Sequence, residues 1–204
     1  FPFPRISYKT SMEKYGTDKP DLRNPIELLN VTKIFKSDEV KLKIFKEIIK
    51  KGGIVKAIPV KNTQSKPRSF FDNLNNWALA EGASGLAYIT FEKNNEKITG
   101  KGPVAKFFSD KSISELLKLC KISEKDSVFF VCNKEAEVNK FAGVARQKIA
   151  EELNLIDNSS FNFCWIIDFP MFHYDDKEKK IDFSHNPFSM PQTEMGDFDK
   201  TDPL

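Results

Sequence analysis

The two histidines of the chain, His173 and His185, are the first residues to consider for acid–base or ligand chemistry. Neither has a partner at metal-ligand spacing, although Asp168 and Asp182 are carboxylates that His185 can be paired with. The sequence contains no glycine-rich phosphate loop, no G-x-S-x-G elbow and no H-E-x-x-H helix. Residue types and spacing alone therefore predict neither a metal site nor a catalytic centre.

The three cysteines, Cys120, Cys132 and Cys164, are odd in number and widely spaced within apolar patterns. This usage argues against a disulfide framework or a zinc site and favours buried thiols in a reducing, cytoplasmic compartment. The longest apolar runs, such as residues 163–167, are far shorter than a membrane-spanning helix. We therefore expect a cytoplasmic protein with no membrane partner.

Basic residues are concentrated between residues 41 and 68, where nine lysines and arginines stand against a single acid. The whole chain has a net charge of only +3, so the remainder is net acidic. A localised basic surface is expected for a polyanionic partner such as nucleic acid. The alternative is a solvated helix face in a lysine-rich protein.

Hydrophobic periodicity predicts helices and strands that alternate from about residue 26 to residue 155. Helices are expected to start near residues 42, 67, 112 and 133, the third at a Ser112–Glu115 capping box and the fourth capped by Asn133. Strands are expected at residues 26–35, 54–60, 85–91, 127–132, 163–169 and 181–185. This pattern is typical of α+β or α/β proteins.

Four longer strings resemble bacterial-type aspartyl-tRNA synthetases, which are class II enzymes. The strings FPRISY and YGTDKPDLR, at residues 3–8 and 15–23, are similar to the family's FPRMTY and YGSDKPDLR segments. Near the other end, WIIDFPMF at residues 165–172 resembles WVVDFPMF, and SHNPFSMP at residues 184–191 resembles xHHPFTxP. Because these strings occur in the family's order, the resemblance covers essentially the whole chain.

Between the flanking strings, residues 85–89, 102–107 and 126–130 fit the family's insertion domain, which also occurs in one of the subunits of the tRNA-dependent amidotransferase. The resemblance implies an α+β insertion domain with a mixed or antiparallel sheet and packed helices at residues 26–158. Strands of the antiparallel class II catalytic core are expected to flank it at residues 1–25 and 159–204. The missing initiator Met and the irregular ends fit an internal fragment of a longer chain.

The resemblance also implies a reaction. The parent enzyme, a cytoplasmic homodimer, is expected to activate aspartate with ATP and Mg²⁺ and to transfer it to tRNA. The family's phosphate-binding arginines belong to motifs that are absent from this chain. We therefore expect the isolated fragment to be inactive, with no catalytic residue, no metal ligand and no cofactor of its own.

Some site residues follow from the family's motifs. His185 matches the first histidine of a pair that contacts the amino acid substrate, and an imidazole can donate to the aspartate carboxylate. The second histidine is replaced by Asn186, whose amide still forms hydrogen bonds. Asp18, Lys19 and Arg23 are expected either to approach the tRNA end or to hold a hinge into the inserted domain.

Two other functions remain open at this stage. One alternative hypothesis is a non-catalytic module that contacts tRNA through a basic face that includes Lys50, Lys51 and Lys61. Another is the insertion domain of the tRNA-dependent amidotransferase, although residues 168–172 and 184–191 argue against it. The sequence does not decide between aspartate tRNA alone and aspartate plus asparagine tRNA.

Overall fold

The computed structural model describes residues 2–94, 97–175, 178–184, 194 and 196–197. Contacts divide the chain into a larger unit, Thr10–Phe163, and a smaller unit, Phe1–Lys9 with Cys164–Leu204. Two residues of the predicted aspartate site, His185 and Asn186, lie outside the described residues. The domain boundaries predicted at residues 25 and 158 remain predictions.

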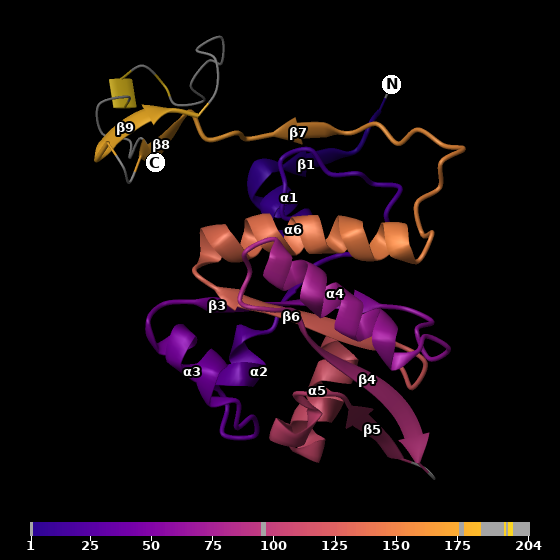
Figure 1. Cartoon of the computed structure of the whole chain (residues 1–204). Coiled ribbons are helices and arrows are strands. Elements are labelled where there is room, and N and C mark those ends of the chain that lie inside the picture. Colours follow the sequence, from indigo (N-terminus) through magenta and orange to yellow (C-terminus); the bar gives the residue numbers. More distant parts are fainter. Residues whose placement is uncertain (1, 95–96, 176–177, 185–193, 195, 198–204) are drawn as a thin grey trace. The chain divides into compact units, whose positions relative to one another are not determined.

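A five-stranded antiparallel sheet forms the centre of the larger unit (Figure 1). The strand order is β2-β3-β6-β4-β5, and every neighbouring pair is antiparallel. The strands are β2 (Leu29–Asn30), β3 (Ile54–Val60), β4 (Ala87–Asn94), β5 (Lys97–Lys101) and β6 (Ser127–Asn133). The α+β class and the antiparallel sheet predicted from the sequence are confirmed.

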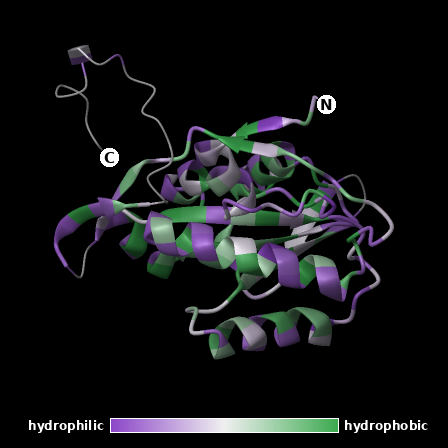
Figure 2. Ribbon diagram, turned by 90° about the horizontal axis from the view of Figure 1, so that it is seen from above, coloured by the Kyte–Doolittle hydropathy of each residue, from purple (hydrophilic) through white to green (hydrophobic). Residues whose placement is uncertain are grey.

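Helices cover both faces of this sheet. In Figure 1, α4 and α6 lie on one side of the sheet, and α2, α3 and α5 lie on the other. The helices are α1 (Tyr8–Tyr15), α2 (Thr32–Lys36), α3 (Lys43–Lys50), α4 (Arg68–Ala80), α5 (Asp110–Cys120) and α6 (Glu135–Glu152), with a 3-10 turn, η1 (Ala105–Phe107). Along these helices hydrophilic and hydrophobic residues alternate (Figure 2), as amphipathic helices on a sheet require.

The two central strands, β3 and β6, are apolar almost throughout because both of their faces are covered. Val55 and Phe130 belong to the core beneath α2, α3 and α5. Ile58 and Phe129 belong to the core beneath α4 and α6. Alternate residues of one strand thus build two separate cores, which fixes the register of the sheet.

Residues 26–35 do not form the predicted long strand. Strand β2 ends at Asn30, whose side-chain Oδ1 accepts a hydrogen bond from the Thr32 amide at 3.0 Å. This side-chain turn leads directly into α2. The β-branched composition suggested a strand, but the asparagine ends it after two residues.

Two predicted helix caps were also wrong. Helix α5 begins at Asp110, and Ser109 is its N-cap, with its Oγ accepting from the Ser112 amide at 3.2 Å. Asn133 is the last residue of β6, and Lys134 is the N-cap of α6. In both cases more than one polar residue lies near the start of the helix. The residue that serves as N-cap is the one that follows the last residue paired with a neighbouring segment, Phe108 before α5 and Asn133 before α6.

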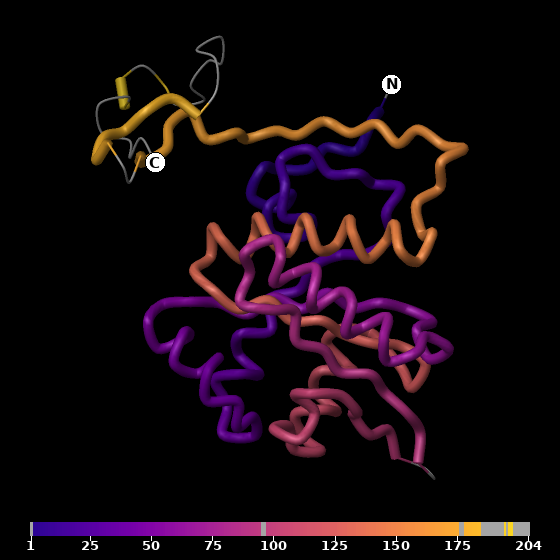
Figure 3. The backbone as a smooth tube through the Cα atoms, viewed as in Figure 1, coloured from indigo at the N-terminus to yellow at the C-terminus, as the bar shows by residue number. Residues whose placement is uncertain are grey.

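The described residues of the smaller unit form four short strands. Strands β1 (Arg5–Ser7) and β7 (Trp165–Ile167) run side by side in parallel (Figure 3), and β8 (Phe172–Asp175) pairs antiparallel with β9 (Lys180–Phe183). The pairing of β1 with β7 is parallel, and the membership of the flanking strands in an antiparallel class II core stays a prediction. Parallel neighbours need a long connection, and residues 8–164 provide one. Asp168, directly after β7, has a φ of 57°.

Candidate functional site

The string at residues 15–23 is packed against helix α6. Gly16, which directly follows α1, has a φ of 72°, and a Cβ on it would lie 2.3 Å from the Asn139 carbonyl oxygen. From the opposite side, a Cβ on Gly143 would lie 2.8 Å from the Gly16 carbonyl oxygen. The two glycines therefore allow a backbone-to-backbone approach that no larger residue permits.

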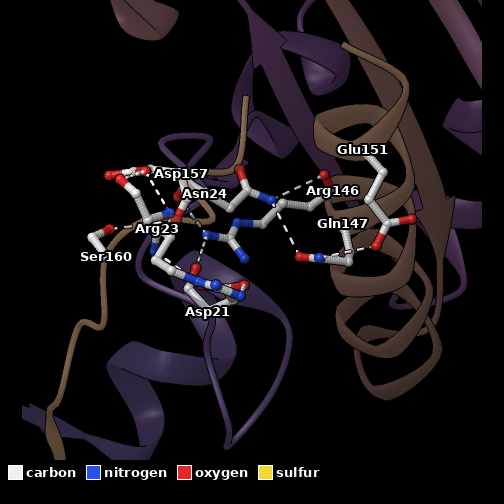
Figure 4. Close-up of polar contacts among 9 residues, drawn as sticks. Asp21, Arg23, Asn24, Arg146, Gln147, Glu151, Asp157 and Ser160 are labelled. Atoms are coloured by element: carbon white, nitrogen blue, oxygen red, sulfur yellow. Dashed lines mark hydrogen bonds and ion pairs between the residues drawn. The ribbon is translucent and has the colours of Figure 1, made fainter. Parts of the chain in front are cut away.

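Arg146 of α6 fixes the rest of this string (Figure 4). Its side chain is buried, with 2% exposure, and donates hydrogen bonds from Nε to the Ile26 carbonyl at 2.5 Å and from Nη2 to the Asp21 and Asn24 carbonyls at 2.9 and 2.8 Å. Its guanidinium also lies 5.0 Å from the centre of the Tyr15 ring. One planar side chain thus holds three carbonyls and an aromatic ring.

Burial lowers the pKa of Arg146, while Tyr15, Asp21 and Glu27 oppose that shift. An arginine nevertheless stays protonated in a protein. The three backbone carbonyls therefore receive hydrogen bonds from a permanent cation, which are stronger than neutral ones.

Asn24 and Arg23 complete the network around this cation. The Asn24 Nδ2 donates to the Arg146 carbonyl at 3.2 Å, and its Oδ1 accepts from the Ile26 amide at 3.0 Å. Arg23 forms a two-pronged pair with Asp21, with 2.9 Å from Nε to Oδ1 and 2.8 Å from Nη2 to Oδ2. The hydrogen bond from Arg23 is the largest cause of the lowered pKa of Asp21.

The other two predicted residues of the string, Asp18 and Lys19, form an ion pair with each other. The Lys19 Nζ is 2.6 Å from the Asp18 carboxylate, and 82% of the Lys19 side chain is exposed. Lys19 also lines an open hollow of about 630 Å³ with Thr17, Asp21 and residues of α6. The structure therefore ties Arg23 into the buried network but leaves Lys19 accessible to a ligand.

The basic window at residues 41–68 does not form a single solvated face. Lys56 is only 2% exposed, and its ammonium donates to the Met12 and Glu13 carbonyls of α1 at 3.1 and 2.6 Å. Desolvation by burial lowers its pKa to about 8, against the opposing influence of Glu13 and Glu135. Lys56 therefore stabilises the packing of α1 and is not available to an RNA backbone.

Lys61 also has a structural partner. Its ammonium is 3.1 Å from Oδ2 of Asp126 and donates to the Lys121 carbonyl. Burial alone would raise the pKa of Asp126, but hydrogen bonds from the Asn62 and Ser123 amides and from Lys61 lower it. Lys61 thus connects the end of β3 to the turn before β6.

Lys50 and Lys51 lie at the other end of β3. Both are exposed, Lys50 as the last residue of α3 and Lys51 as its C-cap. The seven residues of β3 separate them from Lys61 by roughly 20 Å at the usual rise of a strand. The three lysines proposed as one tRNA-binding face are therefore not brought together.

Cys120 and Cys132 are buried, as expected, and Cys164 is half-buried. Burial raises the pKa of Cys120 to about 12 and that of Cys132 to about 11, so both thiols remain protonated at neutral pH. Within the described residues, no three His, Cys, Asp or Glu side chains come together as metal ligands. None of the described helices is long and apolar enough to cross a membrane.

Arg146, Asn24 and Gly143 were not predicted from the sequence. A signal for Arg146 was present, because the residue falls among Ala142, Ala145 and Ile149 on the apolar face of α6. A charged residue at such a position must be paired or hydrogen-bonded inside the protein. Its carbonyl partners, however, lie about 120 residues earlier in the chain and carry no side-chain signature.

Comparison with known proteins finds one domain match and several close relatives. Residues 45–142 match the GAD domain, a segment that contains most of the sheet, most of α3, and helices α4 and α5. The chain is 52% identical over 202 residues to the aspartate–tRNA(Asp/Asn) ligase of Pelagibacter ubique, covering 99% of this chain and 34% of that protein. It is 48% identical over 202 residues to the ligase of the same name from Beijerinckia indica, with the same coverage.

A third relative is the aspartate–tRNA(Asp/Asn) ligase of Wolbachia pipientis, which is 51% identical over 203 residues and covers 99% of this chain and 33% of that protein. The chain thus spans about a third of the length of the curated relatives it matches. The matches extend well beyond residues 45–142, so they include the string at residues 15–23 and strands β7 to β9. Residues 45–142 thus match a GAD domain, and nearly the whole chain is similar to one third of the aspartate–tRNA(Asp/Asn) ligases.

Proposed function

We propose that the chain is part of an enzyme that activates aspartate with ATP and transfers it to tRNA. The observation that carries this proposal is the 52% identity to a ligase of that name over 99% of the chain. Identity at this level extends over both the GAD domain and the flanking strands, so membership of an amidotransferase is not favoured. The names of the relatives include both aspartate and asparagine tRNA, and we propose the same pair of tRNA substrates here.

Within this function, the network around Arg146 supports the hinge interpretation of the string at residues 15–23. Arg146 and Asn24 hold the string onto α6 through buried hydrogen bonds. Arg23 is held by Asp21. A segment fixed in this way gives the chain a defined path from α1 into the sheet. We therefore propose that Arg23 positions this segment and that the exposed Lys19 is accessible to tRNA.

ATP and Mg²⁺ are proposed as reactants of the whole ligase. The described residues bring together no three carboxylate, histidine or cysteine side chains that suit a metal ion. We propose that the metal ligands belong to other parts of the enzyme. We also propose that the 204-residue chain by itself is inactive and that the complete enzyme is a cytoplasmic homodimer.

A chimaera tests the proposal. The corresponding third of the Pelagibacter ubique ligase is replaced by this chain, and aminoacylation of aspartate tRNA is measured with ATP. We expect charging within about tenfold of the parent enzyme, and the chain alone should give no ATP–pyrophosphate exchange. A folded, dimeric chimaera that binds tRNA but does not charge it would overturn the proposed function.

His185 gives a sharper version of the same test. In the chimaera, His185→Ala should raise the KM for aspartate in ATP–pyrophosphate exchange and change the KM for ATP much less, because an imidazole donor to the aspartate carboxylate is lost. His173→Ala is the matched control, since His173 lies on the β8–β9 hairpin and faces Asp182 across it. Unchanged aspartate kinetics in His185→Ala would remove His185 from the site.

A further inference from the structure

Helices α2 and α3 and the segments next to them carry a dense cluster of lysines. Residues 33–51 contain seven lysines against three acids, whereas the whole chain has a net charge of only +3. Six of these lysines are exposed, and within the described part of the chain none of the six forms an ion pair. The six are Lys33, Lys36, Lys41, Lys43, Lys50 and Lys51. We propose that this surface, the α2–α3 basic face, binds the phosphate backbone of tRNA.

The acids of the same stretch do not cancel this charge. The seventh lysine, Lys46, is half-buried, donates to the Ser37 carbonyl at 2.8 Å and lies 3.8 Å from Asp38. Glu39 accepts a hydrogen bond from the Ser109 hydroxyl at 2.6 Å and lies 3.7 Å from Lys111. Two of the three acids therefore already have a cation of their own. The six exposed lysines keep a net positive charge at the surface.

The two helices present their lysines on the same side of the molecule. Helices α2 and α3 pack against each other on one face of the sheet (Figure 1). Ile34 and Phe35 of α2 and Ile49 of α3 belong to a single hydrophobic core. Since the apolar faces point into the same core, the opposite, polar faces both point outward. Lys43 and Lys50, seven residues apart, lie on one stripe of α3 and are separated by about 10 Å at the rise of a helix.

This basic face differs from the window predicted from the sequence. It includes Lys33 and Lys36 of α2, which precede residue 41. It excludes Lys56, which is buried, and Lys61, which pairs with Asp126. Burial and ion pairing, which a charge count does not include, thus move the accessible charge toward α2 and α3.

The composition of the face favours a polyanion over a protein partner. Residues 33–51 contain no arginine, tryptophan or tyrosine, and protein–protein interfaces are enriched in these three types and depleted in lysine. The lysines are spread over two helices and the loop between them, which suits the repeated charges of an RNA backbone. Lysine contacts to phosphates carry no sequence information. The identity of the RNA as tRNA rests on the proposed function.

Fluorescence anisotropy of the 204-residue chain with an aspartate tRNA transcript, across a salt series, tests the proposal. One double variant, Lys43→Gln with Lys50→Gln, removes two charges from α3. Another, Lys33→Gln with Lys36→Gln, removes two charges from α2. Each should weaken binding about tenfold and lower the slope of log affinity against log salt by about 2, because each lysine that contacts a phosphate releases one counterion. Full affinity in both double variants would overturn the proposal.

Lys118→Gln with Lys125→Gln is the charge-matched control. Both lysines are exposed, and neither forms an ion pair within the part of the chain that the structure describes. Lys118 lies in the last turn of α5, and Lys125 lies next to Asp126, which binds Lys61 at the end of β3 away from α3. This variant should keep the affinity and salt slope of the wild type. Equal losses in all three double variants would show that only net charge matters and would also overturn the proposal.

All three double variants should keep the melting temperature of the wild type, because the lysines that they replace are exposed. Polyglutamate serves as a competitor of a different chemical class. At equal charge concentration it should displace tRNA from the chain much less than unlabelled tRNA does. Equal displacement would assign the basic face to an acidic protein and overturn its assignment to RNA.

The chimaera separates this inference from the proposed function. In a chimaera that charges tRNA, the α3 double variant should raise the KM for tRNA and leave ATP–pyrophosphate exchange with aspartate unchanged. An unchanged KM for tRNA in both the α2 and α3 double variants would overturn the basic face and leave the proposed function intact. A chimaera that does not charge tRNA would overturn the proposed function, and the anisotropy series would still decide whether the basic face binds RNA.

Discussion

The segment at residues 15–26, which begins with the string at residues 15–23, uses positive charge differently from the basic window at residues 41–68. In this segment, a single cation from another part of the chain, Arg146, binds three backbone carbonyls. In the window, nine basic residues suggested one surface, yet Lys56 is buried and Lys61 pairs with Asp126. The density of charged residues along the sequence therefore did not predict which cations are buried. The buried cations lie where backbone carbonyls need a hydrogen-bond donor.

Arg146 and Lys56 have more in common with each other than either has with the surface lysines. Each is 2% exposed, and each donates to backbone carbonyls of the segment before β2. The chain between α1 and β2 is irregular, so its carbonyls lack partners from a helix or sheet. Lys56 donates to carbonyls at the end of α1, and Arg146 donates to carbonyls of the connection that follows. The two buried cations together hold this non-regular segment in place.

The largest effect is expected from Arg146. Arg146→Met should reduce the free energy of unfolding by about 3–5 kcal/mol, because the buried Ile26 and Asn24 carbonyls lose this donor and the part-buried Asp21 carbonyl keeps only the Asn24 amide at 3.4 Å. Arg146→Lys should recover only a small part of this loss, since an ammonium cannot reproduce the planar fork. Urea denaturation followed by circular dichroism measures both values.

A matched control for Arg146 is Lys148→Ala, which removes an exposed pair with Glu152 on the same helix. Its effect should be below about 0.5 kcal/mol. If Arg146→Met unfolded at nearly the same urea concentration as Lys148→Ala, the string would be held by something other than this network.

Gly16 is expected to be next in size. Gly16→Ala should destabilise the chain by about 2–4 kcal/mol, because the added Cβ would collide with the Asn139 carbonyl at a positive φ. Gly82→Ala is the control, since Gly82 has a similar φ of 82° and nothing near its Cβ position. Its cost should be about 1 kcal/mol, and the difference in melting temperature between the two variants measures the steric part alone.

The sequence predicted the regular elements better than their connections. Strands at residues 54–60 and 127–132 and helices near 42, 67 and 133 are confirmed, because their apolar periodicity reflects burial on one or both faces. Residues 26–35 failed because one side chain, Asn30, ends the strand. A single hydrogen bond of this kind has no periodic signature.

The candidate site was predicted only as far as a resemblance extends. The string at residues 15–23 was identified, but its partner Arg146 was not, since the contact joins segments about 120 residues apart. The opposite error affected Lys56, which was counted as surface charge although it is 2% exposed. Neither burial nor a carbonyl partner can be inferred from residue type alone, so a charge count overestimates the accessible basic face.

Lys56 predicts a pH dependence. Its pKa is about 8 in the folded chain against an ordinary value of 10.5, so between these values the unfolded chain binds more protons. Stability from this group therefore rises with pH from about 8 to 10.5, and the penalty is complete below about pH 8. Relative to Lys56→Met, the wild type should gain up to about 3 kcal/mol across this window, since one pKa unit corresponds to about 1.4 kcal/mol.

Subtracting the unfolding free energy of Lys56→Met from that of the wild type at each pH cancels the titration of the other lysines and tyrosines. Lys50→Met provides the control, because Lys50 is exposed and should show no such difference. Parallel curves of unfolding free energy against pH for the wild type and Lys56→Met would show that Lys56 titrates normally.

The smallest effect separates Lys61 from Lys50 within the same basic window. Lys61→Ala should lower the free energy of unfolding by about 1 kcal/mol, because the 4% exposed Asp126 loses a partner and the Lys121 carbonyl loses a donor. Asp126 keeps its hydrogen bonds from the Asn62 and Ser123 amides, which limits the loss. Lys50→Ala should leave stability unchanged within about 0.5 kcal/mol.

The same pair of lysines tests whether the window binds tRNA as one face. Lys50 and Lys51 are separated from Lys61 by the length of β3, so a short RNA contact at one end does not reach the other. The double variant Lys50→Glu, Lys51→Glu and the single variant Lys61→Glu should then affect tRNA binding independently, with only the latter lowering the melting temperature. Equal losses of tRNA affinity in both, with unchanged melting temperatures, would instead restore a continuous basic face and show that Lys61 is free to leave Asp126.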